Sequence, residues 1–135
     1  MIYIPEVFMS IGFLIILMIS VFVKKNQNIV LGYLSLLLIF LTQFFVLKDI
    51  FLFEEIFNNF FVIDSFGSFL KSVILICAGF VIYFYLIVKN DSSLNRPEFS
   101  MIILISIIGM MLMVSSNDLL SLFVSIELQS LALYI

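Results

Sequence analysis

Residue types that build metal and redox centres are absent or nearly absent from this sequence. It has no histidine and a single cysteine, Cys77, which lies within an apolar run. A two-histidine haem or zinc site is therefore excluded, and one thiol can neither hold an iron–sulfur cluster nor close an internal disulfide. If the protein acts in a redox system, we expect the chain to bind no metal, cofactor or redox centre of its own.

Charged residues are also scarce. They make up 11% of the chain, whereas apolar residues make up 64%. A soluble domain has roughly a quarter of its residues charged. Too little polar surface remains for water to be the solvent, so the composition predicts a protein embedded in a lipid bilayer. The chain has no cluster of basic residues, and this argues against a nucleic-acid partner.

Alanine and arginine are rare, and tryptophan is absent. Alanine, proline and most arginine codons are rich in G and C, whereas the abundant phenylalanine, isoleucine, leucine and asparagine have codons rich in A and T. We interpret this as the signature of a very A/T-rich genome, of the kind that organelles carry. An A/T-rich bacterium would give the same composition.

Five apolar runs are long enough, or nearly so, to cross a bilayer, which takes about 20 residues with roughly 17 as the lower limit. The sequence therefore predicts an all-α, polytopic transmembrane bundle of about five helices in a single membrane domain, residues 1–135. The predicted spans are Val7–Val23, Ile29–Leu47, Ser72–Val88, Phe99–Val114 and Leu119–Ile135. Ser115–Asp118 forms a short turn before the last span and offers helix-capping side chains.

The only long connector is Lys48–Lys71. At 100° per residue its polar and apolar side chains fall on opposite arcs, a pattern typical of a helix lying in the membrane interface. The polar arc holds Glu54, Glu55, Asn58 and Asn59, and the other arc holds Phe53, Ile56, Phe57, Phe60 and Phe61. The alternative is an irregular, aromatic-rich loop packed on the bundle.

Lysine and arginine in the short loops predict the orientation. The first and third connectors hold Lys24, Lys25, Lys89 and Arg96, whereas the other side holds Lys48 and Lys71. This bias of four against two places the first and third connectors on the cytoplasmic or matrix side and the N-terminus outside.

Glu127 is the leading candidate for chemistry. It is about nine residues into the fifth run, roughly 13 Å along the helix and so near the middle of a hydrocarbon layer of about 30 Å. An ionisable group at that depth costs several kcal/mol. It is tolerated if it is protonated, paired with a cation or facing water, and each of these states is a step in proton movement. The alternative is a structural carboxyl that stays neutral.

Helical spacing places Ser130 and Tyr134 on the same face as Glu127, where their hydroxyls follow the carboxyl along the helix. We therefore include both in the candidate proton-transfer site. A second set of polar and small residues shares the opposite face and predicts a seam for helix packing. This second set is Asp118, Ser121, Ser125, Gln129 and Ala132.

Other acidic and basic residues are weaker candidates. Glu6 and Asp118 suit the positive ends of helix dipoles. Lys71, at the start of the third predicted span, is expected to snorkel to the interface, with a functional role as the less favoured alternative. Asp64 lies at an interface, and the sequence alone assigns it no role.

Two stretches in the last part of the chain carry a family resemblance. Ser115–Leu122 reads SSNDLLSL and Ile126–Tyr134 reads IELQSLALY, with Gly109-Met110-Met111 before them. These stretches closely resemble NADH dehydrogenase subunit 2, an antiporter-like membrane subunit of respiratory complex I. Pro5-Glu6 and Pro97-Glu98-Phe99 also look like that family, and the match runs through the whole chain in order.

The resemblance implies a fold of fourteen helices with a proton route through its centre, of which this chain is similar to the first five. Glu127 falls on the family's fifth-helix glutamate, which pairs with a lysine on the seventh helix. The chain would then be a non-redox, N-terminal piece of a split subunit 2 of proton-pumping NADH:ubiquinone oxidoreductase. The implied partners are the other complex I membrane subunits, above all a separate chain that carries the seventh-helix lysine.

The resemblance further implies that NADH, FMN, iron–sulfur clusters and ubiquinone bind in other subunits, and that the chain lies in the mitochondrial inner membrane or, alternatively, a bacterial plasma membrane. Two other functions stay open. One is a subunit of a multisubunit cation/proton antiporter, and the other is a scaffold fragment that moves no proton. The cost of retaining Glu127 in mid-membrane argues against the scaffold.

Overall fold

The computed structural model describes residues 4–23, 27–49, 54–56, 61–87 and 98–134. Five helices dominate it, and the predicted all-α class is confirmed. The helices are α1 Ile4–Phe22, α2 Gln27–Asp49, α3 Ser65–Ile87, α4 Glu98–Ser115 and α5 Leu119–Tyr134. Two three-residue strands, β1 Glu54–Ile56 and β2 Phe61–Ile63, lie between α2 and α3.

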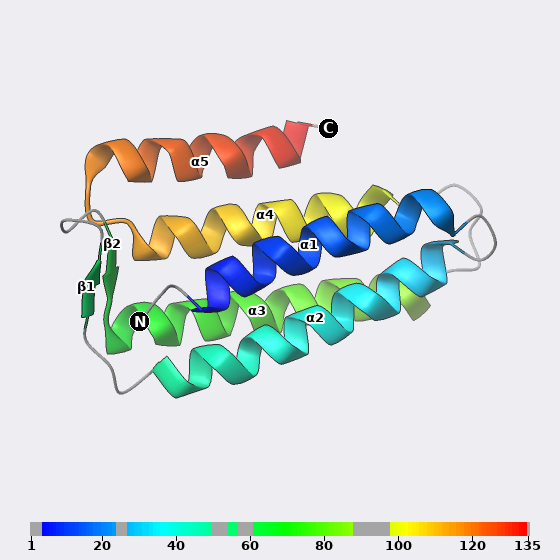
Figure 1. Ribbon diagram of the computed structural model, residues 1–135, viewed down its shortest axis with the longest axis horizontal. Helices are drawn as coiled ribbons and strands as arrows, with labels where there is room; N and C mark the ends of the chain where they lie inside the picture. The colour runs from blue at the N-terminus through cyan, green and yellow to red at the C-terminus, as the bar shows by residue number, and fades with distance from the viewer. Residues whose placement is uncertain (1–3, 24–26, 50–53, 57–60, 88–97, 135) are drawn as a thin grey trace.

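Helix α4 is the central element of the bundle. It packs against each of the other four helices, whereas α5 makes its main contact with α4 alone and lies at the edge of the bundle (Figure 1). The core between α1, α2, α3 and α4 is built from aliphatic and methionine side chains, among them Met9, Leu31, Leu75, Leu104 and Met111. One long face of α5 is therefore left without a neighbour among the described helices.

The outside of the bundle is as apolar as its core. Large side chains such as Phe22, Phe40 and Phe80 are exposed on α1, α2 and α3. Four helices, α1 to α4, are long and apolar enough to cross a membrane, and α5 is a shorter apolar helix of 16 residues. Lipid tails solvate such side chains as well as a protein core does. The chain is thus a multi-pass membrane protein.

The interfacial helix predicted within Lys48–Lys71 is wrong. Glu54–Ile56 and Phe61–Ile63 pair as antiparallel strands, with Glu54 opposite Ile63 and Ile56 opposite Phe61. Residues 50–53 and 57–60 lie outside the described part. Five members of the two predicted arcs are therefore not described, namely Phe53, Phe57, Asn58, Asn59 and Phe60. Phe61-Val62-Ile63 is an aromatic and β-branched run, which favours an extended backbone over a helix.

Helix α3 begins seven residues before the predicted Ser72, whereas the described ends of the other helices agree with the prediction within three residues. Asp64 explains the early start. Its Oδ1 accepts a hydrogen bond of 2.7 Å from the Gly67 amide, and its carbonyl accepts one of 3.0 Å from the Ser68 amide. Asp64 is therefore the N-cap residue of α3.

Candidate functional site

Helix α5 has the two faces that its spacing predicts. Ser121, Ser125 and Ala132 are buried against α4. At the closest approach, a Cβ placed on Gly109 of α4 would lie 2.9 Å from the backbone nitrogen of Gln129. Gln129 thus belongs to the α4–α5 seam, as predicted, and points away from the Glu127 face. Glycine is required here because the two backbones meet with no room for a side chain.

Glu127, Ser130 and Tyr134 lie on the outward side of α5. Glu127 is exposed, Ser130 is half-buried and Tyr134 is 83% exposed. The Ser130 hydroxyl donates a hydrogen bond of 3.0 Å to the backbone carbonyl of Glu127 rather than to its carboxylate. The three residues share a face as expected, and their role in proton transfer stays a prediction.

Glu127 is exposed, so the described residues do not by themselves form a proton route around its carboxylate. Among the described residues no cation forms an ion pair with its carboxylate, and the Glu6–Lys71 ion pair joins two other side chains. A carboxylate that faces lipid has neither a counter-ion nor a water chain. A proton route through Glu127 therefore needs further groups on the open face of α5.

The turn before α5 forms as predicted. Asp118 is exposed, and its carbonyl accepts the Leu122 amide at 3.0 Å and the Ser121 hydroxyl at 2.9 Å. It thus occupies the position that precedes the first helical residue, near the positive end of the helix dipole. This agrees with the predicted position of Asp118 at the helix dipole. Its predicted place in the packing seam is wrong, because Asp118 is exposed and the buried residues of α5 are Ser121, Ser125 and Ala132.

A second group of ionisable residues, which the sequence analysis did not bring together, is buried inside the bundle. Lys71 Nζ lies 2.6 Å from Glu6 Oε1, and both side chains are only 4% exposed. The Ser115 hydroxyl donates a hydrogen bond of 2.8 Å to the same oxygen. Three helices contribute, since Glu6 comes from the first turn of α1, Lys71 from α3 and Ser115 from the end of α4.

The prediction that Lys71 snorkels to the interface is therefore wrong. It assumed that the third helix starts at Ser72, which places Lys71 at the membrane surface. With the N-cap at Asp64, Lys71 lies almost two turns inside α3 and faces the core. The sequence Asp64-Ser65-Phe66-Gly67 carries a signal for the earlier start of α3, because aspartate is a preferred N-cap residue.

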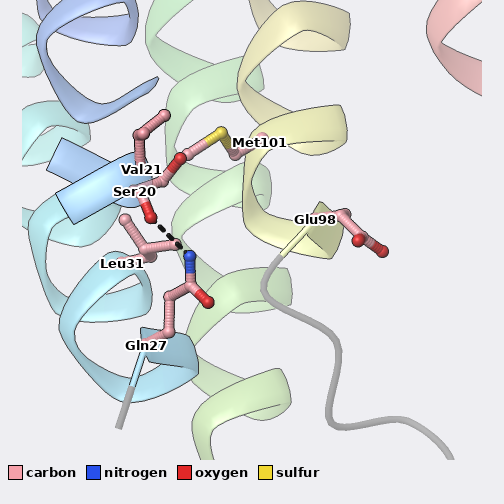
Figure 2. A pocket seen from close by; sticks show the side chains of 6 residues that line it. All are labelled: Ser20, Val21, Gln27, Leu31, Glu98 and Met101. Carbon is pink, nitrogen blue, oxygen red and sulfur yellow. Dashed lines mark hydrogen bonds between the residues drawn. The ribbon is translucent and has the colours of Figure 1, made fainter. Parts of the chain in front are cut away.

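The opposite end of the bundle holds a pocket of about 400 Å³. Its walls come from the end of α1 and the starts of α2 and α4, as Figure 2 shows, and they are formed by Ser20, Val21, Gln27, Leu31, Glu98 and Met101. The Gln27 side-chain amide donates a hydrogen bond to the Ser20 carbonyl and so joins α1 to α2. Glu98, in the first turn of α4, is exposed at the rim.

Comparison with known proteins gives a consistent set of relatives, although no protein-family model matches the chain. The chain is 34% identical over 131 residues to NADH-quinone oxidoreductase subunit N of Parvibaculum lavamentivorans and 35% identical over 133 residues to that of Pelagibacter ubique. It is 35% identical over 132 residues to subunit N 1 of Rhizobium meliloti. Each alignment covers 97% of this chain.

The same alignments cover 27% or 28% of each relative. The chain thus spans little more than a quarter of the length of the curated relatives that it matches, and it corresponds to their N-terminal part. The relatives are, by name, subunits of an enzyme complex.

Proposed function

We propose that this chain forms the N-terminal membrane part of an antiporter-like subunit of a proton-pumping NADH:quinone oxidoreductase, the subunit called N in the relatives and subunit 2 in the resemblance. The observation that carries the proposal is an alignment over 97% of the chain with relatives named for that complex. The multi-pass bundle and the apolar exterior agree with a place in the membrane arm.

The proposed role of the chain is to supply Glu127 to a proton route. Helix α5 packs mainly on α4, so the face that carries Glu127 is open for the rest of such a subunit. A lysine placed there, as the resemblance implies for the seventh helix, would pair with the carboxylate. The pair would then alternate between an ionic state and a proton-transferred state as nearby charges change.

The partners that we propose are the other membrane subunits of the complex and, nearest of all, the remaining part of the antiporter-like subunit, which in the relatives makes up about the other three quarters of the length. The chain is a non-redox component, and NADH, FMN, iron–sulfur clusters and ubiquinone bind elsewhere in the complex. We assign it to the mitochondrial inner membrane on the basis of its amino-acid composition, which is typical of an A/T-rich genome. The bacterial plasma membrane is the alternative, since the relatives are bacterial.

Glu127→Gln tests the role of the carboxyl, because it removes the titratable group while almost preserving the side-chain volume. The complex should assemble, since a neutral amide is easier to place in lipid than a carboxylate. The number of protons moved per electron, measured in sealed vesicles that contain the intact complex, should fall.

Gln129→Leu is the matched control on the same helix. Gln129 lies at the α4–α5 seam, so its replacement changes packing and leaves the outward face of α5 intact. The proton-to-electron ratio should stay at the wild-type value in this variant. An unchanged ratio in Glu127→Gln as well would make Glu127 a structural residue.

A further inference from the structure

The buried ion pair of Glu6 and Lys71 has no part in the proposed role of Glu127. It lies between α1, α3 and α4, at the end of the bundle where α4 leads into α5 (Figure 1). Lys71 Nζ and the Ser115 hydroxyl both approach Glu6 Oε1, at 2.6 and 2.8 Å. A carboxylate, an ammonium and a hydroxyl are thus joined by short hydrogen bonds out of contact with solvent.

Stability does not explain this pair. Two charges lose their hydration when they are buried, and their mutual attraction often only offsets that loss. Apolar side chains of similar volume at such positions are commonly neutral or stabilising. The cost is greater within a membrane, where ionisable residues generally mark ion or proton pathways.

The two oxygens of the Glu6 carboxylate have different surroundings. Oε1 receives both the ammonium and the Ser115 hydroxyl, whereas Oε2 is buried and has no hydrogen-bond donor among the described residues. Buried carboxylate oxygens are nearly always hydrogen-bonded to protein or to ordered water. Oε2 is therefore the atom at which a water or a proton would bind. Asp64, a carboxyl at the same end of the bundle, accepts the Gly67 amide as the cap of α3.

We propose that Glu6, Lys71 and Ser115 form a second proton-transfer site of this chain, distinct from Glu127. The proposal rests on the proposed function, since it assumes that the complex moves protons. Lys71 donates one proton to the Glu6 carboxylate, which gives a neutral amine and a carboxylic acid. The proton is received on Oε1. The carboxyl group then turns about its Cγ–Cδ bond and presents the proton on the side where Oε2 now lies, where a bound water takes it up. The neutral amine of Lys71 regains one proton from the donor that precedes it in the route. One proton enters, one leaves, and the ion pair is restored. The Ser115 hydroxyl holds the carboxylate in place while the ion pair is intact.

Lys71→Arg separates this role from a purely structural one. Arginine keeps the positive charge and can still pair with Glu6, but its guanidinium does not give up a proton in proteins. Lys48→Arg is the matched control, because Lys48 is an exposed lysine at the end of α2. Both variants are built into the intact complex, and the readouts are assembly and the proton-to-electron ratio in sealed vesicles.

We expect Lys71→Arg to assemble and to move fewer protons per electron, with Lys48→Arg unchanged. An unchanged ratio in Lys71→Arg overturns the proposal. If the larger guanidinium prevents assembly, Glu6→Gln/Lys71→Met replaces it, since this double variant leaves no charge to bury. The double variant should assemble and show a lowered proton-to-electron ratio. An unchanged proton-to-electron ratio again overturns the proposal.

If neither variant assembles, the Glu6–Lys71 pair is required for assembly of the bundle, and this result also overturns the proposal. Glu127→Gln, measured in parallel, keeps the two ideas apart. A lowered ratio in Lys71→Arg with a normal ratio in Glu127→Gln supports the second site and removes Glu127 from the proposed function. The reverse result removes the second site alone.

Discussion

At the scale of single residues, one carboxylate decides where the third helix begins. The Asp64 side chain accepts the Gly67 amide, one of the amides that would otherwise be unpaired at the start of α3, and the Asp64 carbonyl accepts the Ser68 amide as the first hydrogen bond of the helix. The cap is worth about 1 kcal/mol to the first turn of such a helix. This start of α3 places Lys71 almost two turns inside the helix, where its side chain is buried and pairs with Glu6.

Asp64→Ala should loosen the first turn of α3. Loss of an N-cap acceptor costs about 1 kcal/mol, which corresponds to roughly fivefold faster backbone amide exchange where local opening controls the exchange. Hydrogen–deuterium exchange of residues 65–68 in the assembled complex measures this. Asp64→Asn retains the acceptor and should exchange at nearly the wild-type rate. Equal exchange in all three proteins would mean that the cap does not hold the helix.

At the scale of helices, α5 is attached through a seam of small and polar residues. Ser121, Ser125 and Ala132 face α4, and Gly109 brings the two backbones together. The seam fixes the rotation of α5, and with it the outward direction of Glu127. The position of the candidate carboxylate is therefore set by residues on the other side of its helix.

Gly109→Ala should weaken the α4–α5 contact. The added Cβ would lie 2.9 Å from the backbone nitrogen of Gln129, an atom that cannot rotate away. Overpacking of this kind typically costs about 1–3 kcal/mol. The fraction of complex that stays assembled after mild heating should fall.

Gly79→Ala is the control for that prediction. Gly79 also lies within a membrane-spanning helix, but a Cβ there would be 3.9 Å from the Ile39 side chain, an ordinary contact. Alanine is also the better helix former. Gly79→Ala should therefore assemble at least as well as wild type. Equal losses in the two variants would show that the close approach at Gly109 carries no special cost.

Apolar length and helical spacing were sufficient to predict the five helices and the two faces of α5, because both depend on local sequence alone. The position of Gln129 away from Glu127 followed from the same spacing. The Glu6–Lys71 pair joins residues far apart in the chain, and its discovery required the packing of α1 on α3 and α4. The pairing of β1 with β2 was not predicted, because the polar and apolar residues of this segment also fit a helical period of about 3.6 residues.

At the scale of the whole molecule, the position of Lys71 alters the argument for orientation. The predicted bias compared four basic residues in the first and third connectors with two on the other side. Lys71 is buried in α3 and cannot be counted in a loop, so one residue, Lys48, remains on that side. The bias becomes four against one. An unequal distribution of lysine and arginine favours the basic loops on the inner side.

The orientation predicts which engineered thiols react on each side of the membrane. Cys77 is exposed on the bundle surface, so the test begins from a Cys77→Ala background. Asn26→Cys, in the first connector, should react with a membrane-impermeant maleimide only when the inner face of the vesicles is outermost. Ser65→Cys, at the exposed start of α3, should react only from the other side, because α2 separates the two positions. The two variants control for each other, since a leaky vesicle would label both.

Modification of Asn26→Cys from the outer side would show that the orientation is the opposite of the predicted one. The Glu6–Lys71 pair would then lie near the inner face, where a proton enters the membrane rather than leaves it.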